Sequence, residues 1–127
     1  MGDIQELMVR IEGFFNKGPG LSSLRALRDG SVMEFLVDDK SFTFKKEGGK
    51  AVVILGKPEK TNFAVRFTME ALEDMLNAKD SYDLRRRVWQ QRRRGAIKFI
   101  PLRDDVGREY FLFGYHYWAR RLGIIYS

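Results

Sequence analysis

The side chains that carry out most enzymatic chemistry are scarce in this 127-residue chain. It contains one histidine, His116 within "YHYW", and no cysteine. A zinc site needs several imidazole or thiolate ligands, and a Cys-His or Ser-His relay needs an imidazole paired with its nucleophile. Because a second imidazole and a thiol are both missing, we predict no metal site, and we predict that His116 is a packed or surface residue.

Two pairs of adjacent acids, Asp38–Asp39 and Asp104–Asp105, have the chemistry of a general acid and a general base. Both pairs lie in sequences typical of turns, where aspartate is favoured because its carboxylate hydrogen-bonds to the backbone. The two glycines of "KEGGK", residues 46–50, lack the spacing of a phosphate-binding or dinucleotide-binding loop. We therefore predict no catalytic residues, no cofactor and a protein that is not an enzyme.

The strongest chemical signal is a cluster of positive charge. The segment "RRRVWQQRRR", residues 85–94, holds six arginines and no acid, and elsewhere 17 Lys and Arg residues balance 17 Asp and Glu residues. If the segment is helical, its arginines cover more than half of the circumference, and Leu84, Val88 and Gln91 lie on the side that faces the core. Tyr82 and Trp89 then point outward among the guanidinium groups.

A surface that mixes guanidinium groups with amphipathic rings suits an anionic membrane, an acidic partner or a nucleic acid. We predict that it docks on a membrane or a partner through Arg85, Arg86, Trp89, Arg92, Arg93 and Arg94. A nucleic-acid-binding module is the less favoured alternative, because no helix-turn-helix, RNP or zinc pattern accompanies the charge. A third interpretation is a solvated helix whose arginines pair with nearby acids.

The composition predicts a single domain over residues 1–127. With 44% hydrophobic residues, a chain of this length can bury a core without disulfides or metals. The absence of cysteine is typical of a reducing compartment, so we predict a cytoplasmic protein. The first 20 residues lack the apolar region of a signal peptide, and no apolar run is long enough to span a bilayer.

The hydrophobic periods predict an α+β fold. A period of three to four predicts a helical segment over 3–28, and alternation predicts four consecutive strands between about 31 and 67, with "AVVIL" suited to a central strand. Two helices follow, one capped by Thr68 and one that begins near Ser81, contains the arginines and ends at Gly95. "AIKFI" then predicts a fifth strand. We expect a mainly antiparallel five-stranded sheet with helices packed over one face.

The C-terminal segment 104–122 predicts a helix, although its aromatic residues also favour a strand. As a helix it carries two apolar stripes, formed by Val106, Tyr110, Phe113 and Tyr117 and by Phe111, Tyr115, Trp118 and Leu122. A helix that is apolar on two sides is buried on two sides. We expect one side to pack on the domain, and the other to meet a second subunit in a homodimer, the N-terminal helix or a bound lipid.

The order of helix, four-strand meander, Thr, two helices and a last strand resembles the sterol carrier protein family, the sterol-binding domain of lipid-transfer proteins. Three pieces within about residues 31–100 carry the resemblance: "SFTFKKEGGKAVVILG", the strand-to-helix junction "NFAVRFTMEALEDML" and the strand "GAIKF". Two positions depart from the family pattern. "NAK" stands where the family usually has a glycine, and "IPLRDD" stands where it usually has a Gly-Asp or Gly-Asn turn.

The resemblance implies noncatalytic binding of a lipid or another apolar small molecule, such as a fatty acyl chain, a sterol or an isoprenoid. It implies a tunnel between the sheet and the helices, with the helix after Thr68 lying across it like a lid. The expected wall residues are Phe35, Phe44, Val53, Phe63, Val65, Phe67, Leu72, Met75, Leu76 and Phe99, with parts of the aromatic tail closing the end. An accessory or oligomerising protein with a filled core is the alternative.

Overall fold

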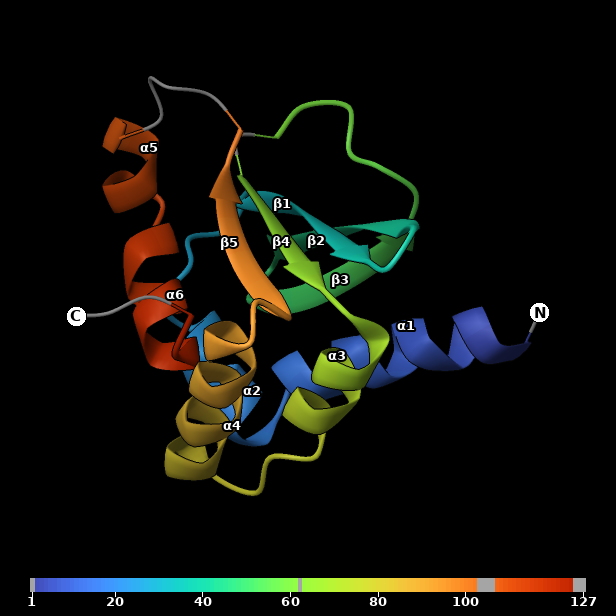
Figure 1. Ribbon diagram of the computed structural model, residues 1–127. Helices are drawn as coiled ribbons and strands as arrows, with labels where there is room; N and C mark the ends of the chain where they lie inside the picture. The colour runs from blue at the N-terminus through green and yellow to red at the C-terminus, as the bar shows by residue number, and fades with distance from the viewer. Residues whose placement is uncertain (1, 62, 103–106, 125–127) are drawn as a thin grey trace.

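A five-stranded sheet forms the centre of the fold (Figure 1). The computed structural model describes residues 2–61, 63–102 and 107–124. The strands are β1 (Val32–Val37), β2 (Lys40–Glu47), β3 (Lys50–Leu55), β4 (Phe63–Phe67) and β5 (Ile97–Pro101), and their order across the sheet is β3-β2-β1-β4-β5. Neighbouring strands are antiparallel except β1 and β4, which are parallel. The predicted α+β class and the mainly antiparallel sheet are confirmed.

The strand order differs from the predicted four-strand meander. β1, β2 and β3 form an antiparallel meander, but β4 pairs with β1 instead of β3. The run "AVVIL" therefore lies at an edge and not in the centre, and its Ile54 and Leu55 are 43% and 53% exposed. Four of the five residues of β4 are buried. Placing β4 in the inner position therefore removes more apolar surface from water than placing β3 in that position would remove.

One face of the sheet is apolar and covered by helices. The register places Phe35 beside Val65 and Val65 beside Phe99, so alternate residues of β1, β4 and β5 project to the same side. The other face carries polar residues such as Thr43 and Arg66. Alternation along each strand therefore separates the core face from the solvent face, as the sequence predicted.

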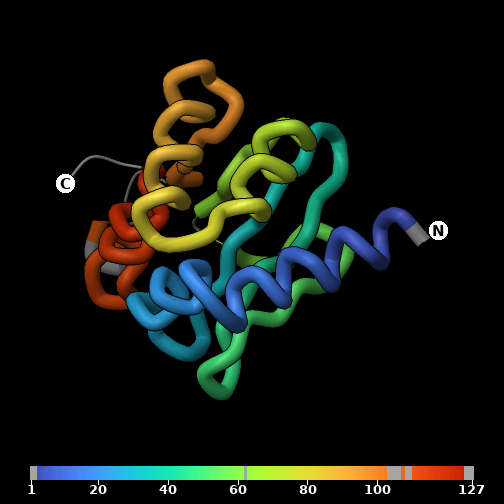
Figure 2. The backbone as a smooth tube through the Cα atoms, turned by 90° about the horizontal axis from the view of Figure 1, so that it is seen from below, coloured from blue at the N-terminus to red at the C-terminus, as the bar shows by residue number. Residues whose placement is uncertain are grey.

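In the part of the chain that the structure describes, six helices pack on the covered face and at its ends (Figure 1, Figure 2). They are α1 (Gly2–Phe15), α2 (Gly18–Leu24), α3 (Met69–Leu76), α4 (Ser81–Arg93), α5 (Gly107–Leu112) and α6 (Tyr115–Leu122). α1 lies against β3, and α4 contacts α2, α3 and α6. Within the described ranges, no helix combines the length and the apolar character needed to cross a membrane.

Side-chain caps define the two helices between β4 and β5. The Thr68 hydroxyl accepts a hydrogen bond from the backbone N–H of Ala71 at 3.1 Å, which confirms the predicted cap of α3. The Asp80 carboxylate accepts from the N–H of Asp83 at 2.8 Å, so α4 begins at Ser81 as predicted. These caps satisfy N–H groups that have no partner inside the helix.

The aromatic tail forms two helices instead of the predicted single helix over 104–122. Gly114 separates α5 from α6 with φ at 84°, in the left-handed region that favours glycine. A Cβ atom at Gly114 would overlap the carbonyl oxygen of Ala26, so the chain also needs glycine there for its close approach to the segment after α2. Residues 104–106, where the predicted helix begins, lie outside the described residues, as does the acid pair Asp104–Asp105.

Candidate functional site

The predicted wall residues lie on the covered face of the sheet and on α3, and most are fully buried. Eight of the ten are at most 4% exposed, whereas Leu76 and Phe99 are half-buried. All ten belong to one hydrophobic core cluster or pack against it. The structure therefore brings these residues together, and their role as ligand walls stays a prediction.

Trp118 of α6 lies at the centre of this core. Its ring centroid lies 6.1–6.4 Å from the rings of Phe15, Phe35, Phe44 and Phe99. The rings of Phe35 and Phe44 stack at 4.5 Å. The Trp118 indole Nε1 is buried and has no hydrogen-bond partner within the part of the chain that the structure describes. The aromatic tail thus supplies a large ring to the middle of the covered face.

The neighbouring tail residues attach α6 to the sheet. The Tyr115 hydroxyl accepts a hydrogen bond from the backbone N–H of Val32 at 3.0 Å and donates to the Val32 carbonyl at 3.2 Å. His116 is half-buried, and its Nδ1 lies 3.3 Å from the Tyr110 hydroxyl, whose pKa is raised by burial. His116 is therefore a packed residue, as predicted.

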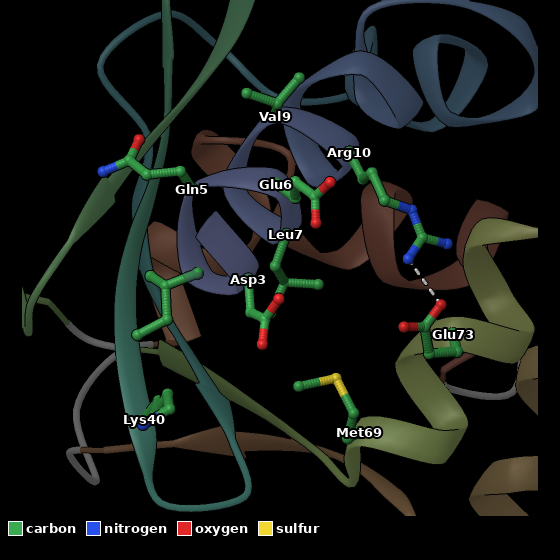
Figure 3. Close-up of a pocket in the computed structure, with 10 residues that line it drawn as sticks. Asp3, Gln5, Glu6, Leu7, Val9, Arg10, Lys40, Met69 and Glu73 are labelled. Carbon is green, nitrogen blue, oxygen red and sulfur yellow. Dashed lines mark ion pairs between the residues drawn. The ribbon is translucent and has the colours of Figure 1, made fainter. Parts of the chain in front are cut away.

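A groove of about 880 Å³ runs between the N-terminal half of α1 and the start of α3 (Figure 3). Its apolar lining comes from Ile4, Leu7, Val9 and Met69, and its polar lining comes from Asp3, Gln5, Glu6, Arg10, Lys40 and Glu73. Leu7 also belongs to the core cluster, so the groove reaches the core. The groove was not predicted. In the sequence, the signal is Val9, an apolar residue that does not share the spacing of Leu7, Ile11 and Phe15. In the structure, Val9 is 68% exposed.

A second groove of about 510 Å³ continues along α1 toward its C-terminal end. Its lining includes the predicted wall residue Leu76, together with Gly13, Phe14 and Pro19. Both grooves share Val9 and Arg10, so they adjoin. Arg10 Nη1 lies 2.7 Å from Glu73 Oε1, and this ion pair joins α1 to α3 (Figure 3). A long apolar molecule could follow α1 through both grooves.

The chemistry of the grooves is that of a binding surface. Apolar side chains remove an apolar molecule from water without directional demands, and the charged groups at the rim hold water and orient a polar end. Among the described residues, no three His, Asp or Glu side chains gather in a way that could hold a metal ion. Asp38 lies in the turn between β1 and β2, and its carboxylate accepts a hydrogen bond from the Met69 N–H at 3.2 Å.

The predicted orientation of α4 is confirmed. Leu84, Val88 and Gln91 are buried, whereas Tyr82 and Trp89 are 73% and 38% exposed. The inward side of the helix therefore packs on the domain, and the outward side carries the two aromatic rings among arginines.

Arg86 and Arg87 of α4 form ion pairs with described residues, which agrees in part with the interpretation of a solvated, paired helix. The Arg87 guanidinium bonds to the carboxylates of Asp74 at 2.7 Å and Asp83 at 2.9 Å, and Arg86 bonds to Asp83 at 2.6 Å. The backbone N–H of Lys79, followed by the Arg87 guanidinium, holds the pKa of the Asp83 carboxyl at about 2. In turn, Asp83 raises the pKa of Arg87.

The other four arginines are placed differently. Arg92 donates a hydrogen bond to the Ile124 carbonyl at 3.1 Å, and the Arg93 guanidinium lies 4.8 Å from the centre of the Trp89 ring. Arg85 and Arg94 are exposed and form no ion pair with any residue that the structure describes. All six predicted docking residues lie on α4 or at its end, and their docking role stays a prediction.

The sequence matches no protein-family model and no curated protein. Among solved structures, the chain is similar to a protein named as UbiJ-SCP2, a ubiquinone synthesis protein, with a TM-score of 0.55 and 13% sequence identity. The match covers 89% of this chain and 93% of that chain. It shows a fold like that of sterol carrier protein 2, which confirms the resemblance at the level of the fold.

Proposed function

Because the chain has the sterol-carrier fold, we propose that it binds a lipid-like apolar ligand and carries it without catalysis. The ligand classes are those that the resemblance to the sterol carrier family implies: a fatty acyl chain, a sterol or an isoprenoid. The name of the structural neighbour, which concerns ubiquinone synthesis, favours an isoprenoid among the three. A cytoplasmic location, predicted from the absence of cysteine, suits such a carrier.

The groove between α1 and α3 is the observation that carries this proposal. Its volume of about 880 Å³ lies within the range of small-molecule sites, roughly 300–1,000 Å³. The ligand would enter beside Val9 and lie against Leu7 and Met69, which contact the core. Leu72 and Met75, the buried wall residues of α3, would then lie on the core side of the ligand, and Leu76 would line the second groove.

Native mass spectrometry of the purified protein, with organic extraction of whatever copurifies, tests the proposal directly. A stoichiometric fatty acid, sterol or isoprenoid is the expected result. If the protein has a clean apo mass and takes up no fluorescent fatty acid, the groove does not hold an apolar ligand and the proposal is wrong.

A matched pair of variants tests the place of binding. Val9→Gln puts an amide against the ligand, which costs about 1–3 kcal/mol when the amide finds no partner, so a fluorescent fatty acid should bind about tenfold or more weakly. Ile54→Gln is the control, because Ile54 is also exposed but lies on β3, outside both grooves. Equal effects of the two substitutions would exclude the groove as the site.

An oligomerising protein with a filled core is the second candidate. Phe111, Leu112 and Tyr117, on α5 and α6, are 51–57% exposed although their neighbour Trp118 is fully buried. They do not form one of the two predicted stripes, since Tyr117 belongs to the first, Phe111 to the second and Leu112 to neither, but they are apolar surface that a second subunit would cover. Sedimentation equilibrium tests it, since a homodimer that Tyr117→Ser weakens would support this candidate and a monomer at all concentrations would exclude it.

A further inference from the structure

Positive charge is concentrated in three segments of the chain, and the helices of these segments pack together in the fold. Residues 16–28, 84–102 and 110–127 contain 12 Lys and Arg residues and no acid, whereas the rest contains 11 Lys and Arg residues and 17 acids. These three segments supply α2, α4 and α6, which pack against one another (Figure 1). Asp83 of α4 and Asp74 of α3 form ion pairs with Arg86 and Arg87, and Asp80 caps the helix.

The exposed ridge of α4 mixes cations with aromatic rings. Tyr82, Arg85, Trp89 and Arg93 recur at intervals of three or four residues, so they lie along one line of the helix. Tyr82 and Trp89 are 73% and 38% exposed, and Arg93 lies over the Trp89 ring at 4.8 Å. Arg94 follows at the end of the helix and is also exposed.

The last turn of α6 extends the basic ridge. A Cβ atom at Gly123 would lie 3.1 Å from the Arg85 Cα atom, so the end of α6 lies directly against α4. Arg120 and Arg121 occupy that turn and are exposed, and Arg121 donates a hydrogen bond to the Ser22 carbonyl of α2 at 2.9 Å. The exposed arginines of α4 and of the last turn of α6 therefore lie on adjoining helices, and sequence reasoning did not include those of α6.

We infer that this surface, formed by the α4 ridge with Arg94, Arg120 and Arg121, docks the protein on an anionic lipid bilayer. Cations attract the phosphate layer of such a bilayer, while Tyr and Trp side chains settle at the headgroup level. A nucleic-acid platform is less favoured, because Arg93 covers one face of the Trp89 ring and leaves Tyr82 as the one ring of the ridge with no cation above it among the described residues. The inference uses the proposed function only to explain why the protein visits membranes.

The docking ridge and the groove lie on different sides of α4. α3, which lines the groove, packs directly against α4, and Figure 2 shows α1, α3 and α4 together on the helical side of the molecule. Asp74 of α3 bonds to Arg87 and Gln91, so the ridge would contact a bilayer on the side of α4 that faces away from the second groove, which Leu76 of α3 and Ala78 line.

Cosedimentation with vesicles of equal phosphatidylglycerol and phosphatidylcholine tests the inference. The triple variant Arg85→Gln, Arg93→Gln, Arg94→Gln should bind on the order of 100-fold more weakly, because each cation near an anionic surface contributes about a factor of five. The control Lys50→Gln, Lys57→Gln, Lys60→Gln removes the same net charge at exposed sites on β3 and between β3 and β4. This control should bind nearly as well as the unaltered protein. Equal losses in both variants, or no binding to these vesicles, would overturn the inference.

Tryptophan emission gives a second readout that reports position. Trp118 is already buried, so a blue shift on vesicle binding would come from Trp89, and Trp89→Phe should abolish the shift. An unchanged spectrum would show that Trp89 does not enter the headgroup layer. Binding to single-stranded RNA that the arginine variant loses, without binding to vesicles, would assign the surface to nucleic acid instead.

These outcomes are separable from failure of the proposed function. Vesicle binding is measured without an added ligand, and fatty acid uptake is measured in solution without vesicles. The arginine variant should therefore keep its fatty acid affinity, and the Val9→Gln variant should keep its vesicle binding. A protein that docks on vesicles but takes up no apolar ligand would sustain the docking surface and reject the carrier.

Discussion

Gly13 offers a substitution that should raise stability while it lowers ligand affinity. It lies inside α1 and lines the second groove, and a Cβ atom built on it meets no other atom within 4 Å. Its φ lies outside the left-handed region, so other residues can adopt its backbone conformation. The Cβ atom of a Gly13→Leu variant therefore finds open space, and its side chain extends into the groove.

The magnitude follows from two separate terms. Glycine in a helix interior is less favourable than alanine or leucine by about 0.5–1 kcal/mol, so both Gly13→Ala and Gly13→Leu should raise the free energy of unfolding by roughly that amount. In the second groove, leucine displaces ligand atoms and alanine displaces few. Each CH2 group that the ligand can no longer bury costs about 0.8 kcal/mol, so the loss of two weakens binding by roughly 15-fold.

Urea unfolding and titration with a fluorescent fatty acid measure the two terms on the same samples. The expected pattern is that both variants gain stability and that only Gly13→Leu loses affinity. If Gly13→Leu binds as tightly as Gly13→Ala, the ligand does not use the second groove. If both variants lose stability, the space that the structure shows beside Gly13 does not exist.

Three further predictions concern stability. Gly114→Ala should destabilise the protein by more than about 2 kcal/mol in urea unfolding, because the residue has a positive φ and its Cβ would overlap Ala26; a loss below about 0.5 kcal/mol would contradict this packing. The pKa of Asp83 is lowered from 3.8 to about 2 in the folded protein, so its stabilising contribution is complete above pH 4 and is lost as the pH falls from about 4 to about 2. Asp83→Asn should flatten that part of the stability profile, and profiles that run parallel would refute the role of Asp83. Trp118→Ala should cost about 3–5 kcal/mol, whereas Trp118→Phe, which also removes the unpartnered Nε1, should cost far less; similar losses would show that the indole N–H has a partner.

Local patterns predicted the elements of this fold well. The period of two in the strands and the spacing of three or four in α4 depend on backbone geometry alone, so Phe35, Val65 and Leu84 face the core as expected. The predicted cap at Thr68 is equally local, because the donor and acceptor lie three residues apart. The concentration of arginines on α4 was also legible in the sequence.

Contacts between distant segments were not predictable from such patterns. Both "AVVIL" and "NFAVRF" have the pattern of apolar strands. Which of the two lies at the edge of the sheet depends on how much apolar surface the whole sheet buries in each of the two arrangements. The groove depends on the distance between α1 and α3, which are more than 50 residues apart in the chain. Likewise, the ion pair of Arg87 with Asp74 forms only when α3 and α4 pack together.

The amino-acid sequence by itself determined which residues are apolar on which face of each helix and strand, and where the positive charge is concentrated. The tertiary structure decided that β4 lies beside β1, that Gly114 divides the aromatic tail, and that Trp118 occupies the centre of the core. The physical reason is range: backbone geometry acts over a few residues, whereas burial and packing depend on every segment that competes for the same apolar surface.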